Sequence, residues 1–343
     1  MKRKIKIGIS VGDLNGIGME IIIKTFLDKR MLDFCTPIIF GSSKSAIFYR
    51  KLCEIQNFSF NTINNIKNIN EKQVNLINCW NDDVKISPGI LSEEISKYAF
   101  ISLEKASNAL QKNEIDALVT APINKSLIRK HVSDFIGHTE YLEKKFDNKA
   151  LMMMISDNMK VACVTSHVAL SEVPKLITKK RIKQCLEIMN KSLVEDFCIQ
   201  RPKIAVMGLN PHAGENGMLG AEEDSVILPA INDVKSNKNI LAFGPFPCDS
   251  FFTSDNIKRY DGILSMYHDQ GLTPFKSLSF SEGVNYTAGL PIIRTSPVHG
   301  TGYDIAGKNI ANANSFRESI YLSCKSNKLR KEYFNLKSNS LAK

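Results

Sequence analysis

The chain has 343 residues and a mass of 38.4 kDa, enough for two domains that each bury an apolar core. Hydrophobic residues make up 43% of it and the mean hydropathy is -0.14, and no apolar run is long enough to span a membrane. The net charge of +10 comes from lysines spread along the chain, not gathered beside stacking aromatics. Composition therefore predicts a globular protein that binds neither membranes nor nucleic acid.

Strand-like apolar runs alternate with amphipathic helical stretches over most of the length. The predicted strands are 5–11, 36–41, 117–122, 160–165, 203–208 and 262–267. A helix is expected at 19–29, another from an N-cap at Ser92 to about residue 110, and a third over 178–197. This alternation is typical of a parallel α/β fold.

The Asn-rich stretch between Phe60 and Val84 has little periodicity and is predicted to be a surface excursion. The basic C-terminal stretch 325–343 is expected to end in frayed chain. No repeat or long linker marks a domain boundary. If two lobes surround a central cleft, we expect residues 1–130 with 300–343 to form the first α/β domain and residues 131–299 the second.

The eight cysteines are widely spaced and include no C-x-x-C pair, which argues against a zinc ribbon or a redox motif. Reduced, mostly buried thiols in the cytoplasm are expected instead. The first apolar stretch is short and lacks a cleavage site, so it predicts a strand and not a signal peptide.

Gly12, Gly16 and Gly18 form a turn between the first strand and the first helix. Their spacing, G-x-x-x-G-x-G, matches neither the dinucleotide fingerprint nor a P-loop. Backbone N–H groups in such a turn can face an anion, and close packing can equally require the glycines.

Three predicted strands each run into a histidine in a polar, turn-rich tip, at His167, His212 and His268. The carboxyl ends of parallel strands share one edge of a sheet, so the three imidazoles are candidates for one divalent metal such as zinc or cobalt. The alternative is three unrelated loop residues. Asp269 either orients His268 or is an ordinary exposed turn residue.

Four further positions are candidates for anion contact. His138 lies near a helix start, with Thr139 as the predicted N-cap. Lys276, Asn285 and Arg294 could form a phosphate cradle, although each taken singly fits an ordinary surface role. The Gly-rich loop after Ser296 would let backbone approach a ligand closely.

Between about residues 7 and 323 the chain resembles the 4-hydroxythreonine-4-phosphate dehydrogenase family of pyridoxal phosphate biosynthesis. The segments that carry the resemblance are GDLNGIG, VTAPINKSLI, FIGHTEYL, VTSHVALSEV, GLNPHAGENGMLGAEE, YHDQGL, GVNYTAGLPIIRTS and HGT. The resemblance implies a homodimer of the isocitrate/isopropylmalate dehydrogenase fold that uses NAD or NADP and a divalent metal (Zn, Co or Mg).

The resemblance also implies residue roles, with the metal site and the dimer interface in the second domain and both subunits contributing to the active site. Metal ligands would be His167, His212 and His268; substrate contacts His138, Thr139, Lys276, Asn285 and Arg294; cofactor contacts His299, Gly300 and Thr301. We expect His138 and Asp269 to be the catalytic residues, with His138 also able to move a proton.

The implied reaction oxidises the secondary alcohol of 4-phosphooxy-L-threonine and is followed by decarboxylation to 3-amino-2-oxopropyl phosphate. The chain departs from the family at Asp13-Leu14-Asn15, often Glu-Pro-Ala, and at Val168 and Ala169, often Leu and Pro. These changes leave the predicted metal ligands intact. The alternatives are a dehydrogenase of four-carbon sugar-acid 4-phosphates, a metal-dependent phosphohydrolase and, with less support, a nucleic-acid-binding protein.

Overall fold

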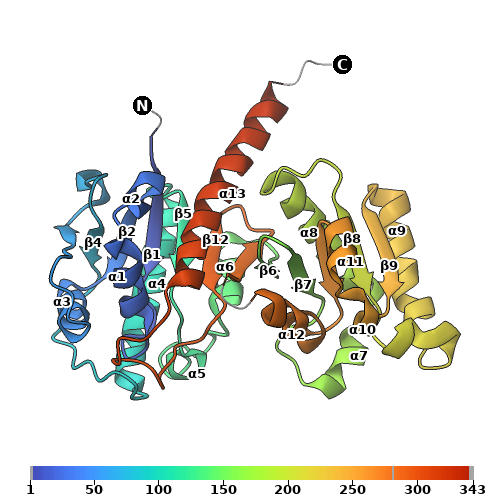
Figure 1. Cartoon of the computed structure of the whole chain (residues 1–343), viewed down its shortest axis with the longest axis horizontal. Coiled ribbons are helices and arrows are strands. Elements are labelled where there is room, and N and C mark those ends of the chain that lie inside the picture. Colours follow the sequence, from blue (N-terminus) through green and yellow to red (C-terminus); the bar gives the residue numbers. More distant parts are fainter. Residues whose placement is uncertain (1–2, 280–281, 340–343) are drawn as a thin grey trace. The chain divides into compact units, whose positions relative to one another are not determined.

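The computed structural model describes residues 3–279 and 282–339 and shows two compact units, which we treat separately (Figure 1). Unit 1 comprises Met1–Asn148 and Leu290–Asn327, and unit 2 comprises Lys149–Gly289 and Lys328–Lys343. These bounds differ from the predicted ones: the chain crosses after residue 148 instead of 130 and returns after 289 instead of 299. Both units mix strands and helices, which confirms the predicted α/β class.

Unit 1 contains six strands in the order β3-β4-β2-β1-β5-β12, and every neighbouring pair is parallel. The strands are β1 (Ile5–Ser10), β2 (Cys35–Gly41), β3 (Asn61–Ile63), β4 (Asn75–Asn78), β5 (Ala117–Thr120) and β12 (Arg294–Pro297). Every residue of β2 is buried, as expected of a parallel strand covered on both faces.

The helices of unit 1 connect these strands. They are α1 (Gly18–Leu27), α2 (Met31–Phe34), α3 (Ser43–Leu52), α4 (Glu93–Gln111), α5 (Lys125–Ile128) and α6 (His138–Phe146), with a 3₁₀ turn at Ile66–Asn68. α4 packs against β1, β2 and β5 through a buried apolar face. The predicted helix at 19–29 and the predicted cap at Ser92 are both confirmed.

The segment predicted as a surface excursion is in part regular. The Asn-rich stretch supplies β3 and β4, because the pairing of β4 with β2 and of β3 with β4 satisfies backbone groups despite a composition that favours loops. The C-terminal segment continues a long helix, α13 (Asn314–Ser338), whose residues from 328 belong to unit 2; residues 340–343 lie outside the described part.

Unit 2 has the strand order β11-β6-β7-β10-β8-β9. These are β6 (Leu151–Ile155), β7 (Lys160–Cys163), β8 (Lys203–Met207), β9 (Leu241–Phe246), β10 (Gly262–Ser265) and β11 (Val284–Ala288). β6 is antiparallel to both β7 and β11, so this side of the unit departs from the parallel arrangement of the predicted strands. The predicted strands β7, β10 and β8 are parallel, and β9, which was not predicted, is parallel to β8.

The helices of unit 2 are α7 (Val173–Leu176), α8 (Lys179–Glu195), α9 (Leu228–Lys238), α10 (Cys248–Phe251), α11 (Ser254–Arg259) and α12 (His268–Ser279), with a 3₁₀ turn at Leu170–Glu172 and a π-helical turn at Glu223–Ile227. α8 is capped by the Thr178 hydroxyl and packs against α9, β6, β10 and β11. No helix in the described part of the chain has the length and apolarity needed to cross a membrane. All eight cysteines are free thiols, and five of them are buried.

The N-cap of α4 offers a test of local stability. The Ser92 hydroxyl accepts a hydrogen bond from the Ile95 N–H at 3.4 Å. We expect Ser92→Ala to lower the free energy of unfolding by about 1 kcal/mol, because that N–H loses its partner. Ser92→Asp, which keeps an acceptor, should retain most of the stability in urea denaturation; equal stability of wild type and Ser92→Ala would contradict the cap.

Candidate active site

The carboxyl ends of β7, β10 and β8 are linked in unit 2 by side chains. The Thr165 N–H and hydroxyl both donate to the Met266 carbonyl, at 3.1 and 2.8 Å. Gln270 accepts from the Met266 N–H and donates to the Gly208 carbonyl, each at 2.7 Å. The three tips that carry the predicted metal ligands are therefore tied together, as the strand-then-histidine pattern predicts.

Two of the three predicted metal ligands lie together. The ring centroids of His167 and His268 are 5.9 Å apart. Nδ1 of His268 lies 2.6 Å from Oδ1 of Asp269, a contact that fixes the ring orientation and leaves Nε2 for a ligand. Asp269 is itself 81% exposed, so the structure fits both the orienting role and the exposed turn considered for it.

The third predicted ligand lies in a left-handed turn, which we define as residues 212–216. All five have φ between 43° and 81°, and four of them are not glycine. Such a backbone costs roughly 1–2 kcal/mol per non-glycine residue, and strained segments of this kind gather at functional sites. His212 is exposed here and its Nδ1 lies 3.4 Å from Glu215 Oε2.

Within residues 3–279 and 282–339, no three or more His, Cys, Asp or Glu side chains are arranged to hold a metal ion. One chain thus brings His167 and His268 together and leaves His212 outside the pair. The imidazole pair has the donor type that zinc and cobalt prefer, and a third donor is still required. The metal site remains a prediction.

Unit 1 buries a guanidinium group at the end of a strand. Arg294 is the first residue of β12, is 2% exposed, and donates to the Thr120 hydroxyl through Nη2 at 2.6 Å and Nε at 3.2 Å. Burial lowers its pKa to about 9. The charge of Glu140 opposes this lowering of the pKa. An oriented guanidinium is well suited to hold a carboxylate or phosphate group, so this placement fits a site for an anionic ligand.

His138 lies near Arg294, whose charge acts on its imidazole. It is the first residue of α6, and its Nε2 is enclosed with no hydrogen-bond partner in the described structure. Burial, followed by the charges of Arg294 and Lys125, holds the pKa of His138 well below its ordinary value. An ideal Cβ on Gly137 would lie 3.1 Å from Lys125 Nζ and 2.8 Å from Glu140 Oε2, so both charges border the start of this helix.

The predicted N-cap at Thr139 is wrong. α6 begins at His138, with the extended Gly137 at the cap position and no side-chain capping bond, so the helix starts two residues earlier than predicted. Thr139 therefore lies in the first turn, half-buried. Thr120, Lys125 and Glu140 are functional candidates that were not predicted; the APINK segment could have indicated Lys125.

The lowered pKa of His138 predicts a pH effect on stability. Below pH of about 6.5 the unfolded chain binds a proton at this residue that the folded chain does not, so stability falls as pH drops through that value. We expect His138→Asn to have a smaller loss of stability between pH 7.5 and 5.5 than wild type, measured by urea denaturation. His299, whose pKa burial also lowers, accounts for part of the remainder. Identical pH profiles would contradict the assignment.

The other two predicted substrate residues, Lys276 and Asn285, lie in unit 2. Lys276 is half-buried in α12, and Asn285 lies opposite Met154 in the antiparallel pair of β11 with β6. Oδ1 of Asn285 is enclosed without a hydrogen-bond partner in the described structure. The predicted set is therefore divided, with His138, Thr139 and Arg294 in unit 1.

The predicted cofactor loop packs on the glycine turn of unit 1. The Thr301 carbonyl accepts from the Ile17 N–H at 2.9 Å, and a Cβ on Gly16 would lie 2.7 Å from that carbonyl oxygen. The Tyr303 hydroxyl donates to Asp13 at 2.8 Å. Close packing thus explains Gly16, and it joins two segments far apart in sequence. Nε2 of His299 is enclosed without a partner in the described residues.

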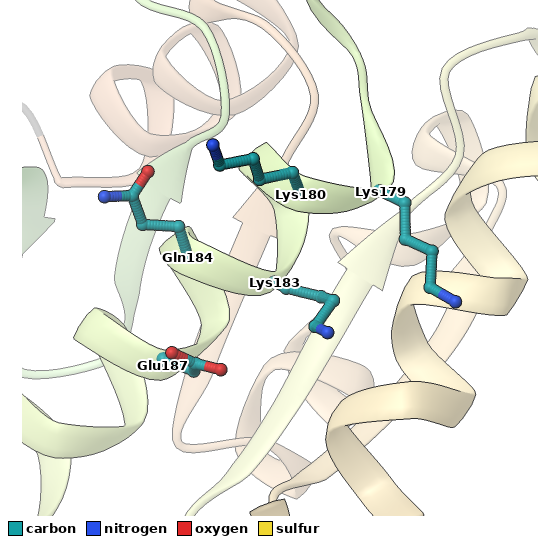
Figure 2. Close-up of a pocket in the computed structure, with 5 residues that line it drawn as sticks. All are labelled: Lys179, Lys180, Lys183, Gln184 and Glu187. Atoms are coloured by element: carbon teal, nitrogen blue, oxygen red, sulfur yellow. The ribbon is translucent and has the colours of Figure 1, made fainter. Parts of the chain in front are cut away.

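A separate open hollow of about 580 Å³ lies along α8 in unit 2. Lys179, Lys180, Lys183, Gln184 and Glu187 line it, and Figure 2 shows the Lys179 and Lys180 side chains pointing away from each other. Lys183 forms an ion pair with Asp233. The hollow contains none of the predicted site residues, and its lysines do not converge on one point.

Comparisons with known proteins agree with the motifs. The 4-hydroxythreonine-4-phosphate dehydrogenase of Bacteroides thetaiotaomicron is 44% identical over 353 residues, covering 99% of this chain and 96% of the relative. A putative D-threonate 4-phosphate dehydrogenase of Oceanobacillus iheyensis is 36% identical over 327 residues, covering 94% and 97%. The solved 4-hydroxythreonine-4-phosphate dehydrogenase of Klebsiella pneumoniae has a TM-score of 0.82 at 30% identity, covering 95% and 98%. The model of one family matches residues 33–323, and the chain belongs to that family, the pyridoxal phosphate biosynthetic protein PdxA.

Proposed function

We propose that the chain oxidises 4-phosphooxy-L-threonine with NAD to 2-amino-3-oxo-4-phosphooxybutanoate, which decarboxylates to 3-amino-2-oxopropyl phosphate. The observation that carries this proposal is the buried Arg294 guanidinium beside an imidazole held neutral. Together they form a preorganised site for an anionic group. The names of the relatives supply the substrate class.

The proposed substrate contacts divide by chemistry. Arg294 and Lys276 would hold the phosphate, and Asn285, whose Oδ1 lacks a partner in the described structure, would accept a hydrogen bond from the substrate. His138 stays neutral at physiological pH, so its enclosed Nε2 can bind the substrate and accept a proton. Thr139 completes the contact at the start of α6.

A divalent metal ion, zinc, cobalt or magnesium, is proposed on His167, His212 and His268. When bound it would supply Lewis-acid chemistry at the substrate hydroxyl. The neighbouring rings of His167 and His268 fit this role, and Asp269 would orient His268. Because His212 lies outside the pair in one chain, the third ligand is proposed to come from a second copy.

The cofactor is proposed to be NAD or NADP, held by His299, Gly300 and Thr301. The enclosed Nε2 of His299, which has no partner in the described residues, is the group that a nucleotide would satisfy. The close packing of Thr301 on Gly16 fixes the loop backbone. A bound nicotinamide would accept the hydride released on oxidation.

We further propose a homodimer, in the cytoplasm, with the active site at its interface. Leu170 and Met218, which follow the tips bearing His167 and His212, are 71% and 79% exposed. Apolar side chains this exposed beside polar site residues fit a surface that a second copy covers.

The proposed dimer interface can be tested by placing charged side chains in it. We expect Leu170→Asp combined with Met218→Asp to turn the dimer into monomers in sedimentation velocity, because two carboxylates would be buried without partners. Leu336→Asp, a change at another exposed leucine, is the matched control and should leave the dimer intact. A dimer that persists in the double variant would place the interface elsewhere.

The reaction is tested by following reduced nicotinamide absorbance with the purified protein, each candidate substrate, and NAD or NADP. Growth of the absorbance with 4-phosphooxy-L-threonine supports the proposal, and growth only with D-threonate 4-phosphate supports the second candidate, which the Oceanobacillus relative favours. Phosphate release without nicotinamide reduction would instead indicate a metal-dependent phosphohydrolase. Chelation followed by add-back of zinc, cobalt or magnesium tests the metal in the same assay.

A further inference from the structure

We propose that Glu223 is a positioning residue that holds the left-handed turn, residues 212–216, in the backbone conformation that presents His212. The inference rests on the proposed function only where it concerns metal binding through His212. Its structural part, the link between Glu223 and the turn, stands on the contacts of unit 2 alone.

The carboxylate of Glu223 is buried, and both of its oxygens accept hydrogen bonds. The residue is 3% exposed. Its Oε1 accepts from the backbone N–H groups of Leu209 and Asn210, at 2.7 and 2.8 Å, and its Oε2 accepts from the Asn210 side-chain amide at 3.0 Å. Hydrogen bonds to a carboxylate are stronger than neutral ones, so Glu223 fixes the segment that enters the turn.

The same carboxylate packs against the turn itself. An ideal Cβ on Gly214 would lie 2.7 Å from Oε2, and one on Gly208 would lie 3.1 Å from Oε1. Both glycines leave room for the carboxylate, which bridges the end of β8 and the middle of the turn. Glu223 opens the π-helical turn that precedes α9, and this rare geometry recurs at functional sites.

Its neighbour Glu222 makes a matched comparison. Glu222 is half-buried, and its Oε2 accepts from the same Asn210 side-chain amide at 2.8 Å. Its hydrogen bonds in the described structure include neither the Leu209 N–H nor the Asn210 N–H. Glu222 therefore has the same charge as Glu223 and contacts the same Asn210 side chain. It differs from Glu223 in making, among the described residues, no hydrogen bond to the backbone N–H groups that precede the turn.

The experiment compares Glu223→Gln with Glu222→Gln in the full-length protein. Glutamine keeps the shape but removes the charge, and its NH2 group replaces one of the two oxygens that accept from Leu209 and Asn210. We expect amide hydrogen exchange at Leu209 and Asn210 to become about tenfold faster in Glu223→Gln, while exchange in β8 stays unchanged. Zinc affinity, measured against a chromophoric chelator, should weaken by about 10- to 100-fold. Glu222→Gln should stay within about twofold of wild type in both measurements.

Each outcome decides a different point. Unchanged exchange and unchanged zinc affinity in Glu223→Gln would overturn the positioning role. A second possible result is that amide exchange becomes faster in Glu223→Gln while His212→Ala binds zinc as tightly as wild type. This result would support the role of Glu223 in the turn and refute His212 as a metal ligand. If Glu223→Gln does not fold, Gly214→Ala disturbs the same contact from the other side, and unchanged exchange in that variant would overturn the inference.

Discussion

Replacing Arg294 by alanine is expected to raise the KM for the phosphorylated substrate about 30- to 150-fold, equivalent to about 2–3 kcal/mol. Arg294 is buried and its guanidinium is already oriented by the Thr120 hydroxyl, so little side-chain entropy is lost when an anion binds. Because the contact is made to a non-reacting group, kcat should change much less than KM. Steady-state kinetics that follow reduced nicotinamide would measure both parameters.

Two controls separate a phosphate contact from damage to the fold. Arg294→Lys keeps the charge but loses the planar fork, and it should lose less affinity than alanine. Wild type should have a much higher kcat/KM for the phosphorylated substrate than for the unphosphorylated amino acid. In Arg294→Ala the ratio of these two values should be much lower. If that ratio stays at the wild-type value, Arg294 does not hold the phosphate.

Replacing His268 by alanine is expected to lower kcat about a thousandfold. The Lewis-acid contribution of a metal ion is several kcal/mol, and each 1.36 kcal/mol is a factor of ten in rate. Among the proposed ligands His268 has the most clearly defined surroundings, because its ring adjoins that of His167 and its Nδ1 contacts Asp269. Chelator-treated wild type should show the same loss and recover on zinc addition, whereas His268→Ala should recover little.

His131 supplies the matched control. It is exposed in unit 1, and its Nε2 contacts the Glu93 carbonyl at 2.7 Å, outside the predicted metal set. His131→Ala should keep wild-type activity and metal content measured by atomic emission. Full activity of His268→Ala in metal-free buffer would refute the metal-dependent mechanism.

Much of the fold was predictable because parallel buried strands are continuous apolar runs. β1, β5, β7, β8 and β10 fall within predicted segments, and β2 begins one residue before its predicted segment. The antiparallel strands β6 and β11 were not predicted. Their pairing with each other joins segments far apart in sequence, and it produces no local repeat of apolar residues. β3 and β4 were missed because pairing at a sheet edge overrode the loop propensity of an Asn-rich sequence.

The residues of the candidate site remain predictions, and the geometry around them could not be predicted from the sequence. The NPHAGENG segment indicates a turn, yet four non-glycine residues at positive φ are not expected from local preference. Contacts with Glu223, which lies beyond the turn in sequence, stabilise that conformation. For the same reason the α6 cap was misplaced, since the extended backbone at Gly137 is set by its surroundings.

The sequence by itself determined the α/β class, the family and the presence of a histidine after each of three strands. Only the tertiary structure decided that His167 and His268 adjoin without forming a three-ligand metal cluster in the described part of the chain, and that Arg294 contacts Thr120, 174 residues away. Local periodicity fixes which face a side chain occupies. Strand order and loop backbone fix which distant side chains come within hydrogen-bonding distance, and those depend on the packing of the whole unit.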